Sequence, residues 1–79
     1  MFKLSILNIE SATIVHQELV SAVVLPGEEG ELAILDFHQP IVCCLKNGII
    51  KISNRNMQIP IKGGIAKMED NELSVLIEE

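Results

Sequence analysis

Residues 41–53 read Ile-Val-Cys-Cys-Leu-Lys-Asn-Gly-Ile-Ile-Lys-Ile-Ser and indicate a β-rich fold. β-Branched and other apolar residues dominate both halves of this stretch, as is typical of strands. Between the halves stand Asn47 and Gly48, residue types that tolerate the positive φ angles of a type I′ turn. The segment therefore predicts a hairpin in which residues 49–53 pair back against residues 41–45.

Alternation of apolar and polar residues extends this pattern toward both ends of the chain. Phe2, Leu4 and Ile6 alternate with polar residues, which predicts a first strand that is buried on one face. Pro60 cannot donate a hydrogen bond to a sheet, so its strand is expected at a sheet edge or at a break. Further strands are expected at residues 13–25, 32–35, 57–61, 65–68 and 73–77.

Short turns separate these strands. Glycine, asparagine and aspartate, which favour turns, gather at residues 27–30, 54–56, 63–64 and 69–72. Helical periodicity is almost absent from the chain. We therefore predict an all-β fold, a flattened β-sandwich or barrel of about eight to ten short antiparallel strands with no C-terminal helical hairpin.

Length and composition predict a single domain over residues 1–79 with an aliphatic core. Hydrophobic residues make up 48% of the chain but aromatic residues only 3%. The core is therefore expected to consist of Ile, Leu, Val, Met and Ala. Domains of this size bury a modest fraction of their surface, and many depend on a partner for stability.

Net charge and apolar run length exclude two classes of partner. The chain carries a net charge of −5, with 11 acidic and 6 basic residues. This balance repels nucleic acid and anionic membrane surfaces. The apolar runs, about five residues long, are far shorter than the roughly 20 residues that span a bilayer. The N-terminus lacks the apolar core of a signal peptide. We expect a cytoplasmic or equivalent compartment and no membrane insertion.

No grouping of residues predicts a catalytic, cofactor or metal site. His16 and His38 are the only histidines, and the familiar nucleophile and metal-binding motifs are absent. Cys43 and Cys44 are adjacent, and we expect both to be reduced because neighbouring strand residues point to opposite faces. A nucleophilic pair of either cysteine with His38 is conceivable, but an apolar strand raises the pKa of a thiol and makes it inert. We predict a chain that is not an enzyme.

Two features instead predict binding to a partner. Residues 41–45 and 23–25 are apolar on both faces of their strands, although a sandwich has a single interior. One face would then form an exposed patch, unless these residues are merely scattered surface hydrophobes. His38 lies in a loop, where it is either satisfied by water and backbone or contacts a partner. Glu31 is expected close by, on the same side of the turn.

Five short stretches resemble the epsilon subunit of rotary ATP synthases. Gly-Glu-Leu-Ala-Ile-Leu is similar to that family's Gly-Glu-Leu-Gly-Ile, and His-Gln-Pro-Ile to its Pro-Gly-His-Ala-Pro-Leu loop. Leu-Lys-Asn-Gly is similar to its Leu-Lys-x-Gly hairpin, Gly-Gly-Ile to its Ser-Gly-Gly turn, and Asn-Glu-Leu-Ser-Val-Leu to its closing strand. The stretches lie at residues 30–35, 38–41, 45–52, 63–68 and 71–76, in the family's order over essentially the whole chain.

The resemblance implies a function and a set of contacts. It implies a flattened β-sandwich in the central stalk of a proton-translocating ATP synthase. Such a subunit performs no chemistry, binds the gamma subunit and the c ring, and helps couple proton flow to ATP synthesis. Glu31 and His38 match family positions that face the polar loops of the c ring. Val42 and Cys44 are our candidates for the gamma-facing apolar surface. The implied location is peripheral, at the cytoplasmic face of a bacterial inner membrane, within a hetero-oligomer.

The chain departs from the family pattern at several places, among them Glu18, where many relatives have Gly, and Gln39, which replaces a common Ala. The loop before His38 reads Asp36-Phe37 where the family usually has Pro-Gly. Most relatives continue into two C-terminal helices that inhibit ATP hydrolysis and in some bacteria bind ATP. This sequence stops at Glu79, so we expect it to lack that switch and that ATP site. The alternatives are an unrelated small β-sandwich interaction module and a redox-active protein with rapidly reacting cysteines.

Overall fold

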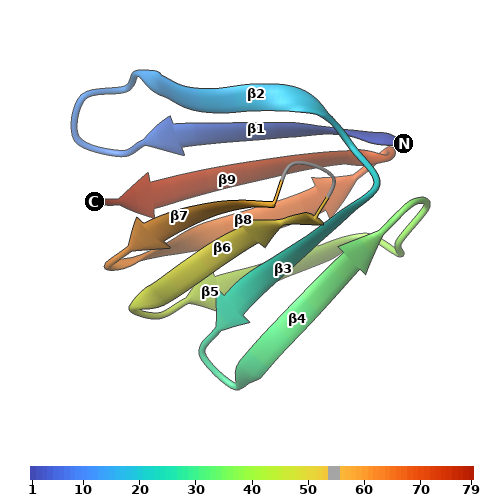
Figure 1. Cartoon of the computed structure of the whole chain (residues 1–79). Helices are drawn as coiled ribbons and strands as arrows, with labels where there is room; N and C mark the ends of the chain where they lie inside the picture. The colour runs from blue at the N-terminus through green and yellow to red at the C-terminus, as the bar shows by residue number, and fades with distance from the viewer. Residues whose placement is uncertain (54–55) are drawn as a thin grey trace.

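The computed structural model describes residues 1–53 and 56–79, and within these ranges the chain forms nine strands and no α-helix (Figure 1). The strands are β1 (Phe2–Asn8), β2 (Ile14–Val20), β3 (Ala22–Gly27), β4 (Gly30–Leu35), β5 (Ile41–Leu45), β6 (Gly48–Ile52), β7 (Met57–Ile61), β8 (Gly63–Glu69) and β9 (Glu72–Glu78). The predicted all-β class is confirmed.

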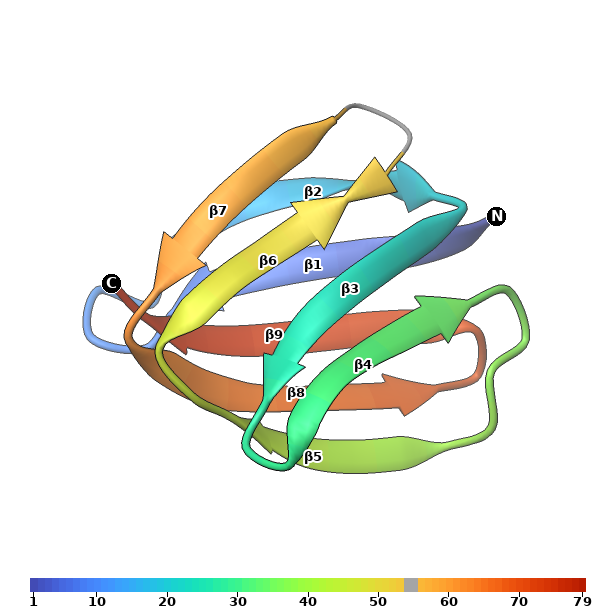
Figure 2. The ribbon, with the colours of Figure 1, turned by 60° about the horizontal axis from the view of Figure 1, so that its bottom comes forward.

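These strands form one curled sheet whose two halves face each other (Figures 1 and 2). The first layer has the order β2-β1-β9-β8-β5, and the second has the order β4-β3-β6-β7. The two layers meet where Gly27 of β3 pairs with Leu45 of β5. Because the sheet folds over at this pair, it encloses one interior, which confirms the predicted flattened sandwich.

Strand direction differs from the all-antiparallel expectation at one pair among the described strands. β1 and β9 run parallel, with Leu4 beside Leu73 and Ile6 beside Val75. Each of these two strands also belongs to an antiparallel hairpin, β1 with β2 and β9 with β8. The parallel pair joins the two hairpins side by side. Apolar alternation is the same for both directions of pairing, so it carries no signal for this arrangement.

The core between the layers is aliphatic, as the composition predicts. Its members are fully or almost fully buried and come from all nine described strands. They are Phe2, Leu4, Ile6, Val20, Val23, Leu25, Ile34, Leu45, Ile50, Ile52, Ile61, Ala66, Met68, Leu73, Val75 and Ile77. Phe2 is the aromatic member of this cluster, and the chain's other phenylalanine, Phe37, is 82% exposed.

The strand expected at residues 13–25 is wrong, because the structure divides it at Ser21 into β2 and β3. β2 pairs with β1 in the first layer, whereas β3 pairs with β4 and β6 in the second. Val20 and Val23 are both buried although they are three residues apart. This spacing breaks the period-two alternation of a single strand and marks the crossing between layers.

The hairpin predicted at Asn47-Gly48 is also wrong. β5 pairs with β8 and β3, and β6 pairs with β3 and β7, so residues 41–45 and 49–53 do not pair within the described chain. Neither Asn47 nor Gly48 has a positive φ angle. A Cβ added to Gly48 would lie 2.6 Å from Cβ of Pro26. The glycine is therefore required by close packing against β3 as the chain changes layers, and not by a tight turn.

Two other turns lie where the sequence predicts them, whereas the turn expected at residues 63–64 is wrong, because Gly63 and Gly64 are the first two residues of β8. Gly27 pairs with Gly30, which places residues 28–29 at the tip of the β3–β4 hairpin, and β3 continues past the predicted end at residue 25 to include Pro26 and Gly27. Residues 70–71 connect β8 to β9 with φ angles of 53° and 56°. Two residues with positive φ between antiparallel strands are the signature of a type I′ turn, so this turn type occurs here and not at Asn47-Gly48.

Pro60 lies on an edge strand, as predicted. β7 is the last strand in the order of the second layer. It pairs with β6, and in this pair Pro60 lies opposite Ile49. The turn predicted at residues 54–56 includes residues 54 and 55, which lie outside the described residues.

Replacement of Gly64 by alanine is expected to lower the free energy of unfolding by about 3 kcal/mol or more. The added Cβ would lie 2.1 Å from the carbonyl oxygen of Leu76, so β8 and β9 would have to move apart. Thermal unfolding followed by circular dichroism measures the loss. Gly63→Ala is the matched control, because its nearest contact, the carbonyl oxygen of Leu45, lies at an ordinary 3.5 Å. Equal melting temperatures for the two variants would contradict the packing argument.

Candidate functional site

The side chains of β5 alternate between the interior and the outside. Ile41, Cys43 and Leu45 are half-buried or buried, whereas Val42 and Cys44 face outward. Val42 is 67% exposed. The expectation that this strand leaves apolar side chains outside the core is therefore confirmed. The role of Val42 and Cys44 in partner binding stays a prediction.

An apolar row continues from β5 across the outer face of the first layer. The strand register places Cys44 beside Ile65, Ile65 beside Leu76, Leu76 beside Leu7, and Leu7 beside Ile14. Ile14 is 60% exposed, Ile65 46% and Leu76 44%. Side chains that are directly opposite on neighbouring strands are in contact range. We call these five residues the outer apolar stripe, and it takes one residue from each strand of the first layer.

The neighbouring row on this face is polar apart from Val42. Val42 pairs with Lys67, and Lys67 pairs with Ser74. Further along this row, Gln17 Nε2 donates a hydrogen bond to Ser5 Oγ at 3.0 Å. Val42 adjoins the outer apolar stripe at Cys44, two residues along the same face of β5. The face thus combines an apolar row with a polar margin, which is the anatomy of a protein–protein interface.

Sequence reasoning missed the stripe residues outside β5. The signal was present as apolar residues at the outward positions of alternating strands, Ile65 on β8 and Leu76 on β9. The sequence does not reveal that these residues form one row, because the row depends on the order of the strands. In particular, the parallel pairing of β1 with β9 sets Leu7 beside Leu76.

Glu31 lies on the outer face of the second layer. It is the second residue of β4 and pairs with Pro26 of β3. Its carboxylate accepts a hydrogen bond from Lys51 Nζ at 3.4 Å, with 68% of the Glu31 side chain and 48% of the Lys51 side chain exposed. An ion pair this exposed adds little to stability and leaves the carboxylate accessible to a partner.

His38 lies in the loop after β4, so the expectation that Glu31 lies close to it is wrong. The length of β4 separates the two residues, because Glu31 is near its start and His38 follows its end. The His38 backbone N–H donates to the carbonyl oxygen of Leu35 at 3.2 Å, and its Nδ1 lies 2.8 Å from the carbonyl oxygen of Gln39. His38 is thus held by backbone contacts while its side chain stays half-exposed.

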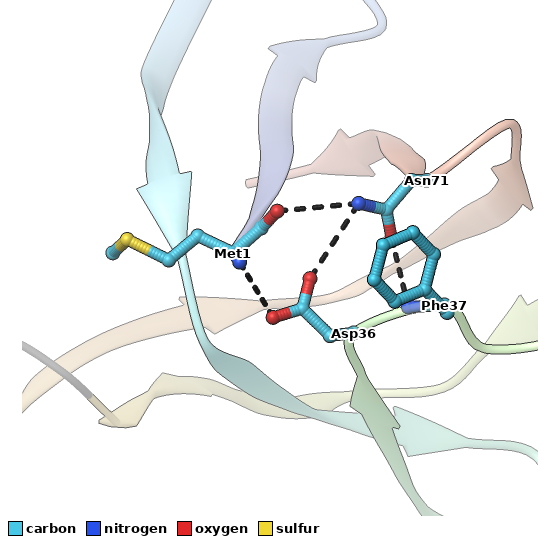
Figure 3. A network of polar contacts seen from close by, with 4 residues as sticks. All are labelled: Met1, Asp36, Phe37 and Asn71. Carbon is cyan, nitrogen blue, oxygen red and sulfur yellow. Dashed lines mark hydrogen bonds and ion pairs between the residues drawn. The ribbon is translucent and has the colours of Figure 1, made fainter.

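A network of polar contacts fixes the start of the His38 loop (Figure 3). The Asn71 side chain donates to the Met1 carbonyl oxygen at 3.2 Å and to Asp36 Oδ1 at 3.5 Å. Its Oδ1 accepts a hydrogen bond of 2.8 Å from the backbone N–H of Phe37. The amino group of Met1 forms an ion pair with Asp36 Oδ2. Three segments that are distant in sequence are therefore joined at the end of the sandwich that carries His38.

A groove of about 530 Å³ lies between the β3–β4 hairpin and β5. Leu32, Ile41 and Cys43 form part of its apolar wall, and Glu28, Glu29 and Glu31 line the hairpin side. The groove is therefore apolar along one side and negatively charged along the other.

The remaining titratable side chains include a close pair on β2. His16 Nε2 lies 2.6 Å from a Glu18 carboxylate oxygen on β2. Within residues 1–53 and 56–79 no group of three or more His, Cys, Asp or Glu side chains could hold a metal ion. Over the same ranges, no helix is long and apolar enough to cross a membrane.

The two cysteines are free and differ in environment. Cys43 is half-buried and Cys44 is exposed. Burial raises the pKa of the Cys43 thiol above its ordinary value, and the neighbouring Cys44 raises it further. The expected inertness thus has a physical basis at Cys43, whereas Cys44 is accessible to reagents.

Comparison with known proteins supplies a family for this fold. Residues 1–79 match the family described as "ATP synthase, Delta/Epsilon chain, beta-sandwich domain". Proteins named ATP synthase epsilon chain are similar in sequence. The protein from Pelagibacter ubique is 40% identical over 77 residues, covering 95% of this chain and 58% of that protein. The one from Gloeobacter violaceus is 37% identical over 65 residues, covering 80% and 49%. The chain thus spans about half the length of these relatives.

Solved structures show the same fold. A chain in the structure of the Euglena gracilis mitochondrial ATP synthase, OSCP/F1/c-ring, matches 96% of this chain with a TM-score of 0.82 and 25% identity. A chain in the central stalk/c-ring structure of the Tetrahymena thermophila mitochondrial ATP synthase matches 98% with a TM-score of 0.78 and 14% identity. This chain covers 49% and 63% of those two chains. The alternative of an unrelated small β-sandwich is set aside by the family match.

Under native conditions, a maleimide reagent is expected to label Cys44 on the order of tenfold faster than Cys43. Only the thiolate reacts, and both burial and the raised pKa keep Cys43 protonated at neutral pH. In a Cys44→Ser variant, labelling of Cys43 should therefore keep accelerating as the pH rises past the ordinary pKa of a thiol. Mass spectrometry of the labelled chain measures both rates. In denaturant the two thiols should react alike, and equal rates in the folded chain would contradict this account.

Proposed function

Because the chain belongs to the family of ATP synthase delta/epsilon-chain β-sandwich domains, we propose that it is a non-catalytic rotor subunit of a proton-translocating ATP synthase. In this role it binds the gamma subunit and the c ring of the central stalk and helps couple proton flow to ATP synthesis. The observation that carries the proposal is the family match over residues 1–79. The epsilon-chain names of its relatives support it.

We assign the gamma subunit to the outer face of the first layer. The outer apolar stripe and Val42 form a row of partly exposed apolar side chains next to polar residues. Burial of apolar surface contributes roughly 25 cal/mol per Å², so a subunit that covers this row gains affinity from several side chains at once. Cys44, at the end of the stripe beside Val42, lies within this surface.

We assign the c ring to β4 and the loop that follows it. β4 is paired with β3, and among the described strands it has no partner on its other side. Glu31 near its start and His38 after its end are polar groups that can accept or donate charge-assisted hydrogen bonds. Glu28 and Glu29 add negative charge beside Glu31. A ring surface with basic and amide groups complements this edge.

The two assigned surfaces lie on different sides of the sandwich. Val42 and the stripe face away from the core on the first layer, whereas Glu31 faces away from it on the second. Both partners could therefore be bound at the same time by one rigid domain. A torque-carrying element needs this rigidity and needs no catalytic group, so the proposal is that the chain acts as a structural coupling subunit.

Membership of such a complex places the chain at a membrane without requiring it to enter the bilayer. We propose a peripheral position at the cytoplasmic face of a bacterial inner membrane, in contact with the c ring. This position agrees with the acidic surface of the chain, because its net charge of −5 disfavours direct binding to anionic lipid.

Co-purification with the gamma subunit of the same organism tests the assignment. The wild-type chain should bind gamma one to one, and Val42→Asp should weaken binding by about 2 kcal/mol or more, because it buries a charge in an apolar contact. Val42 is 67% exposed in the free chain, so the variant should still fold.

Ile49→Asp is the matched control on the second layer, where Ile49 is 41% exposed. It should bind gamma like the wild type. If both variants lose binding equally, gamma does not bind specifically to the outer face of the first layer. If the folded wild-type chain does not bind gamma, the proposed function itself is wrong.

A further inference from the structure

The loop after β4 contains a strained and exposed aromatic residue. Phe37 has a φ angle of 56°, in the left-handed region that bulky residues rarely occupy and glycine adopts freely. Its side chain is 82% exposed, although the chain has only one other phenylalanine and that one is buried. Neither burial of the ring nor an intrinsic preference of the backbone explains this conformation.

The Asn71 side chain supplies the contacts that hold Phe37 in this conformation (Figure 3). Asn71 Oδ1 accepts the Phe37 backbone N–H at 2.8 Å, while its Nδ2 donates to the Met1 carbonyl oxygen and to Asp36 Oδ1. Asn71 itself has a φ angle of 56° within the β8–β9 turn. One amide therefore ties the His38 loop to the β8–β9 turn and to the start of β1.

We propose that Asn71 is a positioning residue that locks the loop at residues 36–39, so that Phe37 is presented as an aromatic contact to the c ring. This inference rests on the proposed function, since it adds a contact to the loop that carries His38. Three observations support it: the strained backbone of Phe37, the exposure of its ring, and the hydrogen bond from the Phe37 N–H to the Asn71 side chain that holds this conformation.

The chemistry of the partner follows from the surroundings of Phe37. The chain is acidic overall, with a net charge of −5, whereas the carboxylate of Asp36 beside Phe37 is already paired with the amino group of Met1. A surface that complements this side carries lysine or arginine groups, and the face of an aromatic ring attracts such cations. Aromatic side chains held in one conformation are typical anchors of interfaces, because little conformational freedom is lost on binding.

Two glycine variants test separately whether Phe37 contacts the c ring and whether Asn71 positions Phe37. Phe37→Gly removes the ring and relieves the backbone, so the melting temperature of the free chain should stay the same or rise by about 3–6 °C. Its affinity for purified c ring in detergent should nevertheless fall at least about fivefold. Asn71→Gly removes the amide but keeps a residue that accepts positive φ, so the β8–β9 turn is preserved.

Asn71→Gly should weaken ring binding in the wild-type background and have less than about a twofold further effect when combined with Phe37→Gly. Amide exchange followed by NMR should show faster exchange at the Phe37 N–H in this variant, while the amides of β4 keep their protection.

Ring binding by Phe37→Gly equal to that of the wild type would overturn the contact, and unchanged Phe37 exchange in Asn71→Gly would overturn the positioning role. If the wild-type chain binds neither gamma nor the ring, the proposed function falls and this inference with it. If the wild type binds both and the two glycine variants do so equally well, this inference alone is wrong.

Discussion

Burial of an aliphatic core between two halves of one curled sheet is the constraint on which the rest of the structure depends. With only 3% aromatic residues, the chain has to enclose side chains from all nine described strands to build that core. Each strand can turn only one face inward. The sheet folds over where Gly27 meets Leu45, and the chain repeatedly changes layers to fill both halves. Apolar residues on the remaining faces, such as Val42, stay exposed.

This division of faces gives the domain its proposed use. The outer apolar stripe lies on the first layer, and the charged and polar groups of β4 and its loop lie on the second layer and at its edge. In the described residues one cluster of buried side chains separates these surfaces, and in the proposed role a load applied at one surface would reach the other through sheet hydrogen bonds and core contacts. A subunit that links a shaft to a ring requires this combination of two distinct surfaces and a stiff body.

Much of this arrangement follows from local sequence signals, and the failures have a common cause. Alternation at Phe2, Leu4 and Ile6, and at Leu73, Val75 and Ile77, correctly predicts which faces are buried, because burial is decided residue by residue along a strand. Pairing is decided between strands, and here local signals mislead. Asn47-Gly48 has the composition of a hairpin turn, yet its glycine is needed for packing on Pro26 as the chain changes layers.

The candidate site shows the same limit. Exposure of Val42 was predictable from an apolar strand in a sandwich, whereas the row that joins Cys44 to Ile65 and Leu76 depends on strand order and on the parallel pair. The Asn71 contacts with Phe37 join residues 34 positions apart and leave no periodic signal. Family resemblance pointed to Glu31 and His38, and their separation follows from the strand that the sequence already predicts at residues 32–35, which the structure shows as β4.

The native thiol of Cys44 provides the most direct measurement of the central claim, that gamma covers the outer face of the first layer. The labelling rate of Cys44 would be compared in a Cys43→Ser chain, free and in its purified complex with gamma. Cys44 is exposed in the free chain and lies at the end of the outer apolar stripe. The account predicts that labelling slows by about tenfold or more in the complex, because gamma would exclude the reagent. An unchanged labelling rate in an intact complex would contradict it and would place gamma on another surface of the domain.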